Sequence, residues 1–134
     1  MLLSACGPDS TALRCTAATD RAPMLGENFT VRYQDNATVE SEDLRLTFSQ
    51  LVGDSRCPSG VQCVWEGDAE VGVLAARSGT QPQTLSLHTN GRFQTDAPYA
   101  GYVVHLLSVA PYPEAGHSVP ATDYCVGLRV TRAE

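Results

Sequence analysis

The amino-acid sequence predicts an all-β domain, an antiparallel two-sheet sandwich of immunoglobulin-like type. Apolar and polar residues alternate with a period of two in several short segments from residue 28 onward, and turn residues separate these segments. No segment has the apolar spacing of a long amphipathic helix. A small β-barrel is the alternative architecture, because its strands would show the same alternation.

Six segments have the strand pattern, and they cover residues 29–33, 44–49, 68–76, 83–88, 102–110 and 124–131. Segments rich in Gly, Pro, Asn, Asp and Ser separate them, at residues 34–36, 77–79, 90–91 and 111–116. In the last strand Tyr124, Val126, Leu128 and Val130 share one face, which we expect to face the core. Cys125 then lies on the other face.

The length and charge of the chain limit its class. A chain of 134 residues corresponds to one domain with a single core. The formal net charge of −6 argues against a nucleic-acid partner and against electrostatic adsorption to anionic lipid headgroups. No run of 18 apolar residues occurs, so the sequence predicts no ordinary transmembrane helix.

The N-terminal segment Leu3-Ser4-Ala5-Cys6 resembles the bacterial lipobox, in which a small residue before cysteine precedes the site of lipidation. We therefore expect residues 1–6 to be the remainder of a signal peptide, with Cys6 as the lipidated residue. Residues 7–24 are then a tether and residues 25–134 the sandwich domain. This places the protein in the bacterial cell envelope, anchored to a membrane by lipid and facing the periplasm or the exterior.

Four cysteines remain if Cys6 carries lipid, an even number in an oxidising compartment. Three pairings are possible. Cys57 and Cys63 flank a Pro-Ser-Gly turn and are close enough in sequence to pair, which leaves Cys15 with Cys125. A zinc site is the rival interpretation, but the Cys-x5-Cys spacing has no matching histidine pair.

The stretch around this first pair predicts a constrained corner between two strands. Pro58 fixes its own backbone angle and Gly60 can adopt a left-handed turn. The simpler expectation is a stabilising loop with Trp65 in the core. If Trp65 is displayed instead, the loop becomes a recognition surface together with Arg56, Val61 and Gln62. Arg56 is expected to form a local ion pair with Asp54, worth at most about 1 kcal/mol if exposed.

The motif Asp54-Ser55-Arg56-Cys57-Pro58, with Val61, Cys63-Val64-Trp65 and Gly67 after it, resembles a pattern in uncharacterised bacterial envelope proteins, many of them predicted lipoproteins. The similarity continues through Tyr99–Tyr102 to Val109-Ala110-Pro111. Glu66 stands where that pattern has a small residue. The resemblance implies an envelope location and implies no particular chemistry.

Catalytic signatures are absent from the sequence, which contains no Gly-x-Ser-x-Gly, His-Glu-x-x-His or phosphate-binding glycine loop. The three histidines are His88, His105 and His117. A metal site could join two of them to Asp96 or Asp123, although their spacing does not require it. For His105, in an apolar run, we expect a partly buried, hydrogen-bonded imidazole. We expect no cofactor and no metal.

Three functions follow from these observations. The first is a non-enzymatic binding or structural module for an envelope protein or glycan, acting through an end loop or through a tyrosine–proline face. The residues of that face are Tyr99, Tyr102 and Tyr112, of which some are expected in the core together with Tyr124. The first alternative is a protease inhibitor that presents residues 59–62 on the Cys57–Cys63 loop. The second is a metal-dependent hydrolase that uses His88 and His117.

Overall fold

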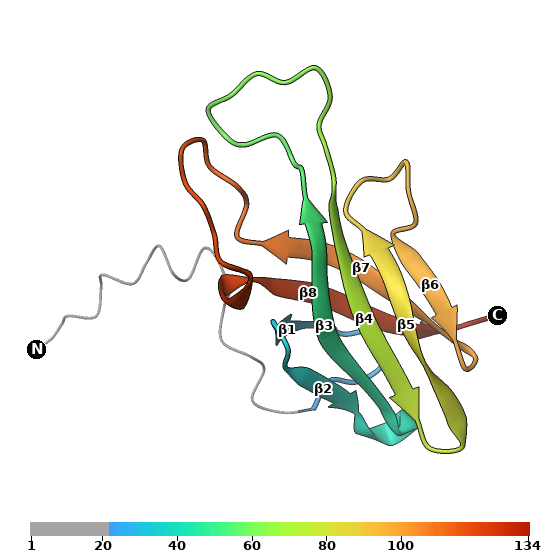
Figure 1. Ribbon diagram of the computed structural model, residues 1–134. Coiled ribbons are helices and arrows are strands. Elements are labelled where there is room, and N and C mark those ends of the chain that lie inside the picture. The colour runs from blue at the N-terminus through green and yellow to red at the C-terminus, as the bar shows by residue number, and fades with distance from the viewer. Residues whose placement is uncertain (1–21) are drawn as a thin grey trace, which may run out of the picture.

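The protein is a sandwich of two four-stranded antiparallel sheets in the computed structural model, which describes residues 22–134 (Figure 1). One sheet has the order β1 (Asn28–Arg32), β8 (Cys125–Arg132), β7 (Tyr102–Ala110) and β6 (Asp96–Tyr99). The other has the order β2 (Asn36–Val39), β3 (Leu44–Asp54), β4 (Ala69–Arg77) and β5 (Thr80–His88). The sheets are separate, so the predicted sandwich is confirmed and the barrel alternative is wrong.

Each sheet is built largely as a meander. Strands β2 to β5 follow one another in one sheet, and β6 to β8 follow one another in the second, where β1 adds beside β8. The two layers resemble those of an immunoglobulin domain, in which the strands are joined by Greek-key connections. In this protein, by contrast, most strands of a sheet follow one another directly in the sequence. Two 3-10 turns, η2 (Glu40–Glu42) and η3 (Ala121–Asp123), complete the described elements.

The predicted segments correspond to β1, β3, β4, β5, β7 and β8, whereas β2 and β6 were not predicted. Both have only four residues, and the first begins in a segment that the sequence marks as a turn. Strand β3 continues to Asp54, five residues beyond the prediction. Register shifts against β4, between Phe48 and Gln50 and between Leu51 and Gly53, interrupt the alternation there and hide the continuation.

The core lies between the sheets and is filled by the residues that alternate inward. Its largest fully buried side chains include Leu46 and Phe48 of β3, Val73 of β4 and Leu128 of β8. Tyr33 contacts the Phe48 ring edge-on, with 5.3 Å between ring centroids. Burial of this apolar surface is the main force that holds the two layers together.

Cys125 begins β8 outside this core cluster and is nevertheless only 3% exposed. It is disulfide-bonded. The other cysteines that the sequence offers it, Cys6 and Cys15, lie outside the described residues, as do the lipobox and nearly all of the expected tether, residues 7–24. Among residues 22–134, no helix has the length and apolar character needed to cross a membrane.

The end of the sandwich at η2 is closed by a polar cluster around Glu42. The Tyr102 hydroxyl donates a 2.5 Å hydrogen bond to Glu42, and Arg132 approaches the same carboxylate at 3.1 Å. The Arg77 guanidinium donates to the Glu42 carbonyl and lies over the Tyr102 ring. The hydrogen bond from Tyr102 lowers the pKa of Glu42 below its usual value and raises the pKa of Tyr102. Tyr102 therefore contributes to the structure of this end of the sandwich through its contacts with Glu42 and Arg77.

Two leucines on neighbouring strands test this assignment of core and surface. Replacing Leu128, which is fully buried, with Ala should lower the free energy of unfolding by about 2–5 kcal/mol, because a cavity remains in the core. The matched control is Leu107→Ala on β7, where the side chain is 40% exposed and the change should be within about 0.5 kcal/mol. Urea unfolding measures both, and equal losses would contradict the burial pattern.

Candidate functional site

Three loops meet at the end of the sandwich opposite η2. They are residues 55–68 between β3 and β4, residues 89–95 between β5 and β6, and residues 111–120 between β7 and η3. Figure 1 shows all three extending toward the upper end of the view, the first of them the longest. Loop ends are where sandwich domains commonly place binding residues, because the sheets hold the loops in position.

The loop 55–68 continues the β3–β4 ladder before it opens. The amide of Ser55 donates to the Asp68 carbonyl at 2.7 Å, and the amide of Cys57 donates to the Glu66 carbonyl at 2.9 Å. Gly67 makes this possible: it has φ +78°, and a Cβ there would lie 2.0 Å from the Ser55 carbonyl oxygen. Only glycine fits at this position, because no backbone atom can move far enough to admit a side chain.

A disulfide closes the outer part of the same loop. Cys57 and Cys63 are bonded, with their Cα atoms 6.0 Å apart, as the sequence predicted. Within the ring, the Val61 amide donates to the Pro58 carbonyl at 3.2 Å, and Gly60 has φ +85°. The tip is therefore a tight turn that the disulfide constrains at its base.

Arg56 joins this loop to the opposite sheet. Its Nε and Nη2 atoms each lie 2.7 Å from an oxygen of Asp54. Its Nη1 donates to the Val109 carbonyl at 2.6 Å and its Nη2 to the Pro111 carbonyl at 2.9 Å. The Asp54 and Arg56 side chains are only 8% and 7% exposed. The expected ion pair is present, and because both side chains are buried, the limit of about 1 kcal/mol for an exposed pair does not apply to it.

The buried pair extends to Tyr124, whose hydroxyl donates to Asp54 Oδ2 at 2.7 Å. Burial alone would raise the pKa of Asp54, but hydrogen bonds from Arg56 and Tyr124 and the Arg56 charge lower it below its usual value. Burial first, and then the hydrogen bond to Asp54, raises the pKa of Tyr124 to about 12. Asp54 is therefore an anion and Tyr124 a neutral donor at physiological pH.

Loop 111–120 packs against the disulfide loop through further contacts. Ser59 forms an isolated parallel bridge with Glu114, and its amide donates to the Pro113 carbonyl at 3.0 Å. The Tyr112 hydroxyl donates to the Cys57 carbonyl at 2.7 Å, while its ring covers the Arg56 guanidinium at 4.9 Å from the centroid. Tyr112 is still 53% exposed.

Loop 89–95 is held to the first loop by Asn90, one of two buried polar residues among positions 22–134. The Asn90 side-chain amide donates to the Gly67 carbonyl at 2.8 Å and to the Glu66 carboxylate at 3.0 Å, and its backbone amide donates to Asp68. This places Phe93 beside Trp65, with 6.4 Å between ring centroids and the planes nearly perpendicular. Neither Asn90 nor Phe93 was predicted from the sequence as a site residue, and Asn90 was assigned only to a turn. A lone phenylalanine in a polar turn is the signal that could have indicated Phe93.

The three loops together expose a group of apolar side chains, which we name the aromatic end: Val61, Val64, Trp65, Phe93 and Tyr112. Val64 is fully exposed, Trp65 is 41% exposed and Phe93 is 46% exposed. Five of the eight exposed large hydrophobic residues among positions 22–134 belong to this end. The expectation of Trp65 as a core residue is wrong, because Trp65 is 41% exposed and lies outside the core cluster.

The other residues named from the sequence divide between this end and the core. Val61 and Gln62 are exposed at the tip of the loop. Tyr99 and Tyr102 are each only 4% exposed, so they belong to the core and not to a binding face. The tyrosine–proline face is therefore wrong as a surface, and only Tyr112 of the proposed set is displayed.

The three histidines are held apart, each near a different carboxylate. His88 Nδ1 lies 2.6 Å from Asp68, His105 Nδ1 lies 3.4 Å from Asp96, and His117 Nδ1 lies 3.7 Å from Glu114. His105 is 25% exposed and bonds to Thr131, as expected. Across the described part of the chain, no group of three or more His, Cys, Asp or Glu side chains is arranged to hold a metal ion. The structure does not bring His88 and His117 together.

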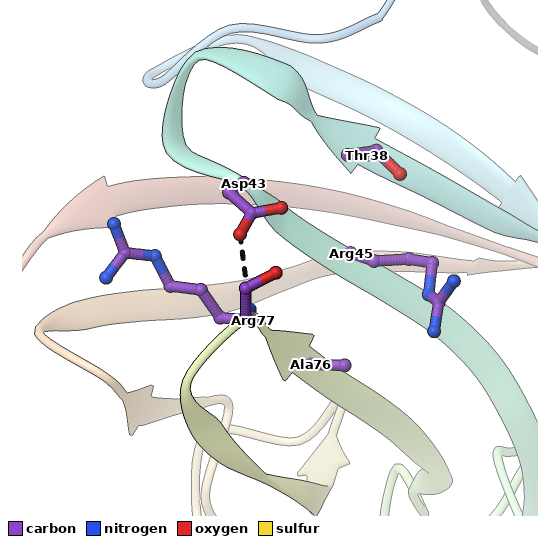
Figure 2. A pocket seen from close by; sticks show the side chains of 6 residues that line it. Thr38, Asp43, Arg45, Ala76 and Arg77 are labelled. Carbon is purple, nitrogen blue, oxygen red and sulfur yellow. Dashed lines mark hydrogen bonds between the residues drawn. The ribbon is translucent and has the colours of Figure 1, made fainter.

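A pocket of about 340 Å³ lies at the opposite end, between the start of β3 and the end of β4. Its lining includes Arg45 and Arg77, which suggests an anion site, but Figure 2 shows their guanidinium groups extending to opposite sides. Asp43 is also part of the lining and accepts a hydrogen bond from the Ser78 amide at 3.2 Å. Two diverging cations beside a carboxylate form no convergent anion site.

No protein-family model matches the chain, and no curated protein or solved structure matches it. The chemistry of the aromatic end therefore provides the guide to function.

The buried ion pair predicts how the free energy of unfolding depends on pH in acid. At neutral pH, Asp54→Asn should lower the free energy of unfolding by about 3–5 kcal/mol, because Arg56 then lies buried without a charged partner. The Asp54 pKa is depressed, so the stability from ionised Asp54 is complete above its unfolded pKa and is lost as pH falls through the lower folded value. The difference between wild type and variant should therefore shrink between about pH 4 and pH 2.

Denaturant unfolding at several pH values measures this difference, with Asp43→Asn at the opposite end as control. The control should leave the acid limb of the wild-type curve unchanged. A difference for Asp54→Asn that stays constant down to pH 2 would contradict the ionised buried pair.

Proposed function

We propose that the protein is an envelope-anchored lipoprotein whose sandwich is a non-enzymatic binding module for another envelope component. The observation that carries the proposal is the display of Val64, Trp65 and Phe93 on loops that are fixed by a disulfide, a buried ion pair and Asn90. Large contiguous apolar patches on a protein surface are typical of interaction sites. The lipobox resemblance of residues 3–6 supports the anchor.

A constrained loop favours binding for an energetic reason. Ordering a flexible loop on association costs conformational entropy, and this cost lowers affinity. Here the backbone of residues 55–68 is held before any partner arrives, by Ser55, Cys57 and Ser59 amide hydrogen bonds and by the Cys57–Cys63 disulfide. The exposed rings can therefore be covered at little further entropic cost.

The protease-inhibitor alternative has less support. Residues 59–62 are exposed, as that function requires. However, the Ser59 backbone is bonded to loop 111–120, and the Val61 amide is bonded within its own turn. A strand that adds to a partner's sheet needs free backbone groups in extended conformation. The hydrolase alternative has less support still, since the histidines are dispersed.

Site-specific photo-crosslinking in the source organism tests the binding module. A benzophenone amino acid at position 64 should give a discrete crosslinked product, because Val64 is fully exposed in the aromatic end. The matched control places the same amino acid at Ser78, at the opposite end, where we expect no such product. Adding Trp65→Ala and Phe93→Ala should remove the product from position 64. Identical products from positions 64 and 78, or none from either, would refute the proposal.

The anchor is tested separately by mass spectrometry of the protein extracted from its own membranes. We expect a diacylglycerol adduct on Cys6, lost in Cys6→Ser together with membrane association. A full-length protein that begins at Met1 and carries an unmodified Cys6 would contradict the anchor while leaving the binding surface untouched.

A further inference from the structure

The aromatic end has the residue types that dominate the energy of protein–protein contacts. Tryptophan, tyrosine and phenylalanine are enriched in the centres of interfaces, where their large area is buried at low entropic cost. Trp65 and Phe93 contact each other edge-to-face, and Val61 and Val64 of the same loop as Trp65 are exposed. The remaining question is which partner chemistry suits the charges around them.

Those charges are predominantly negative. Glu66 follows Trp65 directly, and Asn90 holds its carboxylate where loops 55–68 and 89–95 meet. Glu70 is 33% exposed beside His88, whose ring lies 5.1 Å from that of Phe93. Glu114 of the third loop is 66% exposed. All three carboxylates belong to the loop end of the sandwich, Glu66 and Glu114 in the loops and Glu70 at the start of β4.

Positive charge at the same end is limited. Arg56 is buried and paired with Asp54, so its charge is compensated within the domain. Within the three loops as the structure describes them, Arg92 is the one exposed arginine. The loops and the start of β4 thus carry the carboxylates of Glu66, Glu70 and Glu114 beside the guanidinium of Arg92, an excess of negative charge at the aromatic end.

This field discriminates between possible occupants. A second copy of the chain would bring two negative ends together, which like-charge repulsion disfavours. A bilayer rich in anionic lipid is disfavoured for the same reason. A polypeptide with an apolar residue next to arginine or lysine satisfies both features, since its side chain covers the rings while its cations face the carboxylates.

We propose that the aromatic end binds a protein segment in which an apolar anchor residue is flanked by arginine or lysine. The inference rests on the proposed binding function and adds the chemistry of the partner. Trp65 and Phe93 receive the anchor, and Glu66, Glu70 and Glu114 select the flanking cations.

Selection from random dodecapeptides displayed on phage identifies the preferred chemistry without assuming a sequence. The full chain is the bait, and the Trp65→Ala variant removes peptides that bind elsewhere. We expect a consensus with Arg or Lys within two residues of a large apolar residue. A consensus without basic residues, or no enrichment over the variant, would overturn the inference.

Binding of a selected peptide is then measured by the fluorescence of Trp65, the only tryptophan of the chain. Phe93→Ala should weaken binding at least about 30-fold, as expected for a hot-spot residue. Glu66→Gln should weaken it by up to about fivefold, an effect that high salt removes. Glu40→Gln at the opposite end is the matched control and should change nothing. Thermal melting of each variant confirms that the fold is retained.

Lipid vesicles test the alternative that the aromatic end binds a membrane surface. We expect the Trp65 emission to remain unchanged with vesicles of phosphatidylethanolamine and phosphatidylglycerol. An emission shift with vesicles in the absence of any peptide response would overturn the inference in favour of a lipid surface. If position 64 gives a crosslinked product but the selected peptides show no preference for basic residues, only the proposed partner chemistry is refuted. If neither the crosslinked product nor the basic preference is found, the proposed binding function is refuted as well.

Discussion

The buried ion pair between Asp54 and Arg56 is the interaction on which the aromatic end depends. Asp54 is the last residue of β3 and Arg56 the second residue of the loop, yet the guanidinium donates to Val109 and Pro111 at the end of β7. One side chain thus joins both sheets and two loops. A buried charge is costly unless it is fully paired, and here two carboxylate contacts and two carbonyl acceptors compensate the Arg56 charge. Lysine could not replace it, because a single ammonium lacks this planar set of donors.

Three further features hold the loop in place around this ion pair. Gly67 allows the two sides of the loop to approach, the Cys57–Cys63 disulfide fixes its tip, and Tyr112 covers the guanidinium from outside. Gly67 sets the distance between the two sides of the loop, the disulfide limits movement of the tip, and Tyr112 fixes the contact with loop 111–120. A displayed apolar surface can therefore be rigid although it lies entirely on loops, which are otherwise the most mobile parts of a domain.

Local sequence patterns were sufficient to predict the two sheets of the fold. The exposed side chains of the site depend instead on contacts between residues that are far apart in the sequence. Alternation was sufficient for the inward residues of β1, β4 and β8, and short sequence separation was sufficient for Cys57 with Cys63. Trp65 could not be placed this way, because its position depends on contacts between loops that are distant in the sequence, such as its contact with Phe93. Tyr99 was assigned to a binding face because it lies beside Pro98 outside any predicted strand, but β6 pairs with β7 and both Tyr99 and Tyr102 are buried. Phe93 was missed because its neighbour Trp65 is 28 residues away in the sequence.

The exposure of Trp65 and Phe93 is not a consequence of incomplete packing. The core is closed at one end by Glu42 with Tyr102 and Arg132, and at the other by Asp54, Arg56 and Tyr124, so neither ring is needed to exclude water from it. Apolar rings on a fixed surface are a liability for solubility, because they offer a contact to any apolar neighbour. Adjacent carboxylates reduce that liability, since they repel other copies of an acidic chain. On the proposed partner chemistry, the same carboxylates would also attract the cations of a basic segment, so that one electrostatic field would both oppose self-association and favour the partner.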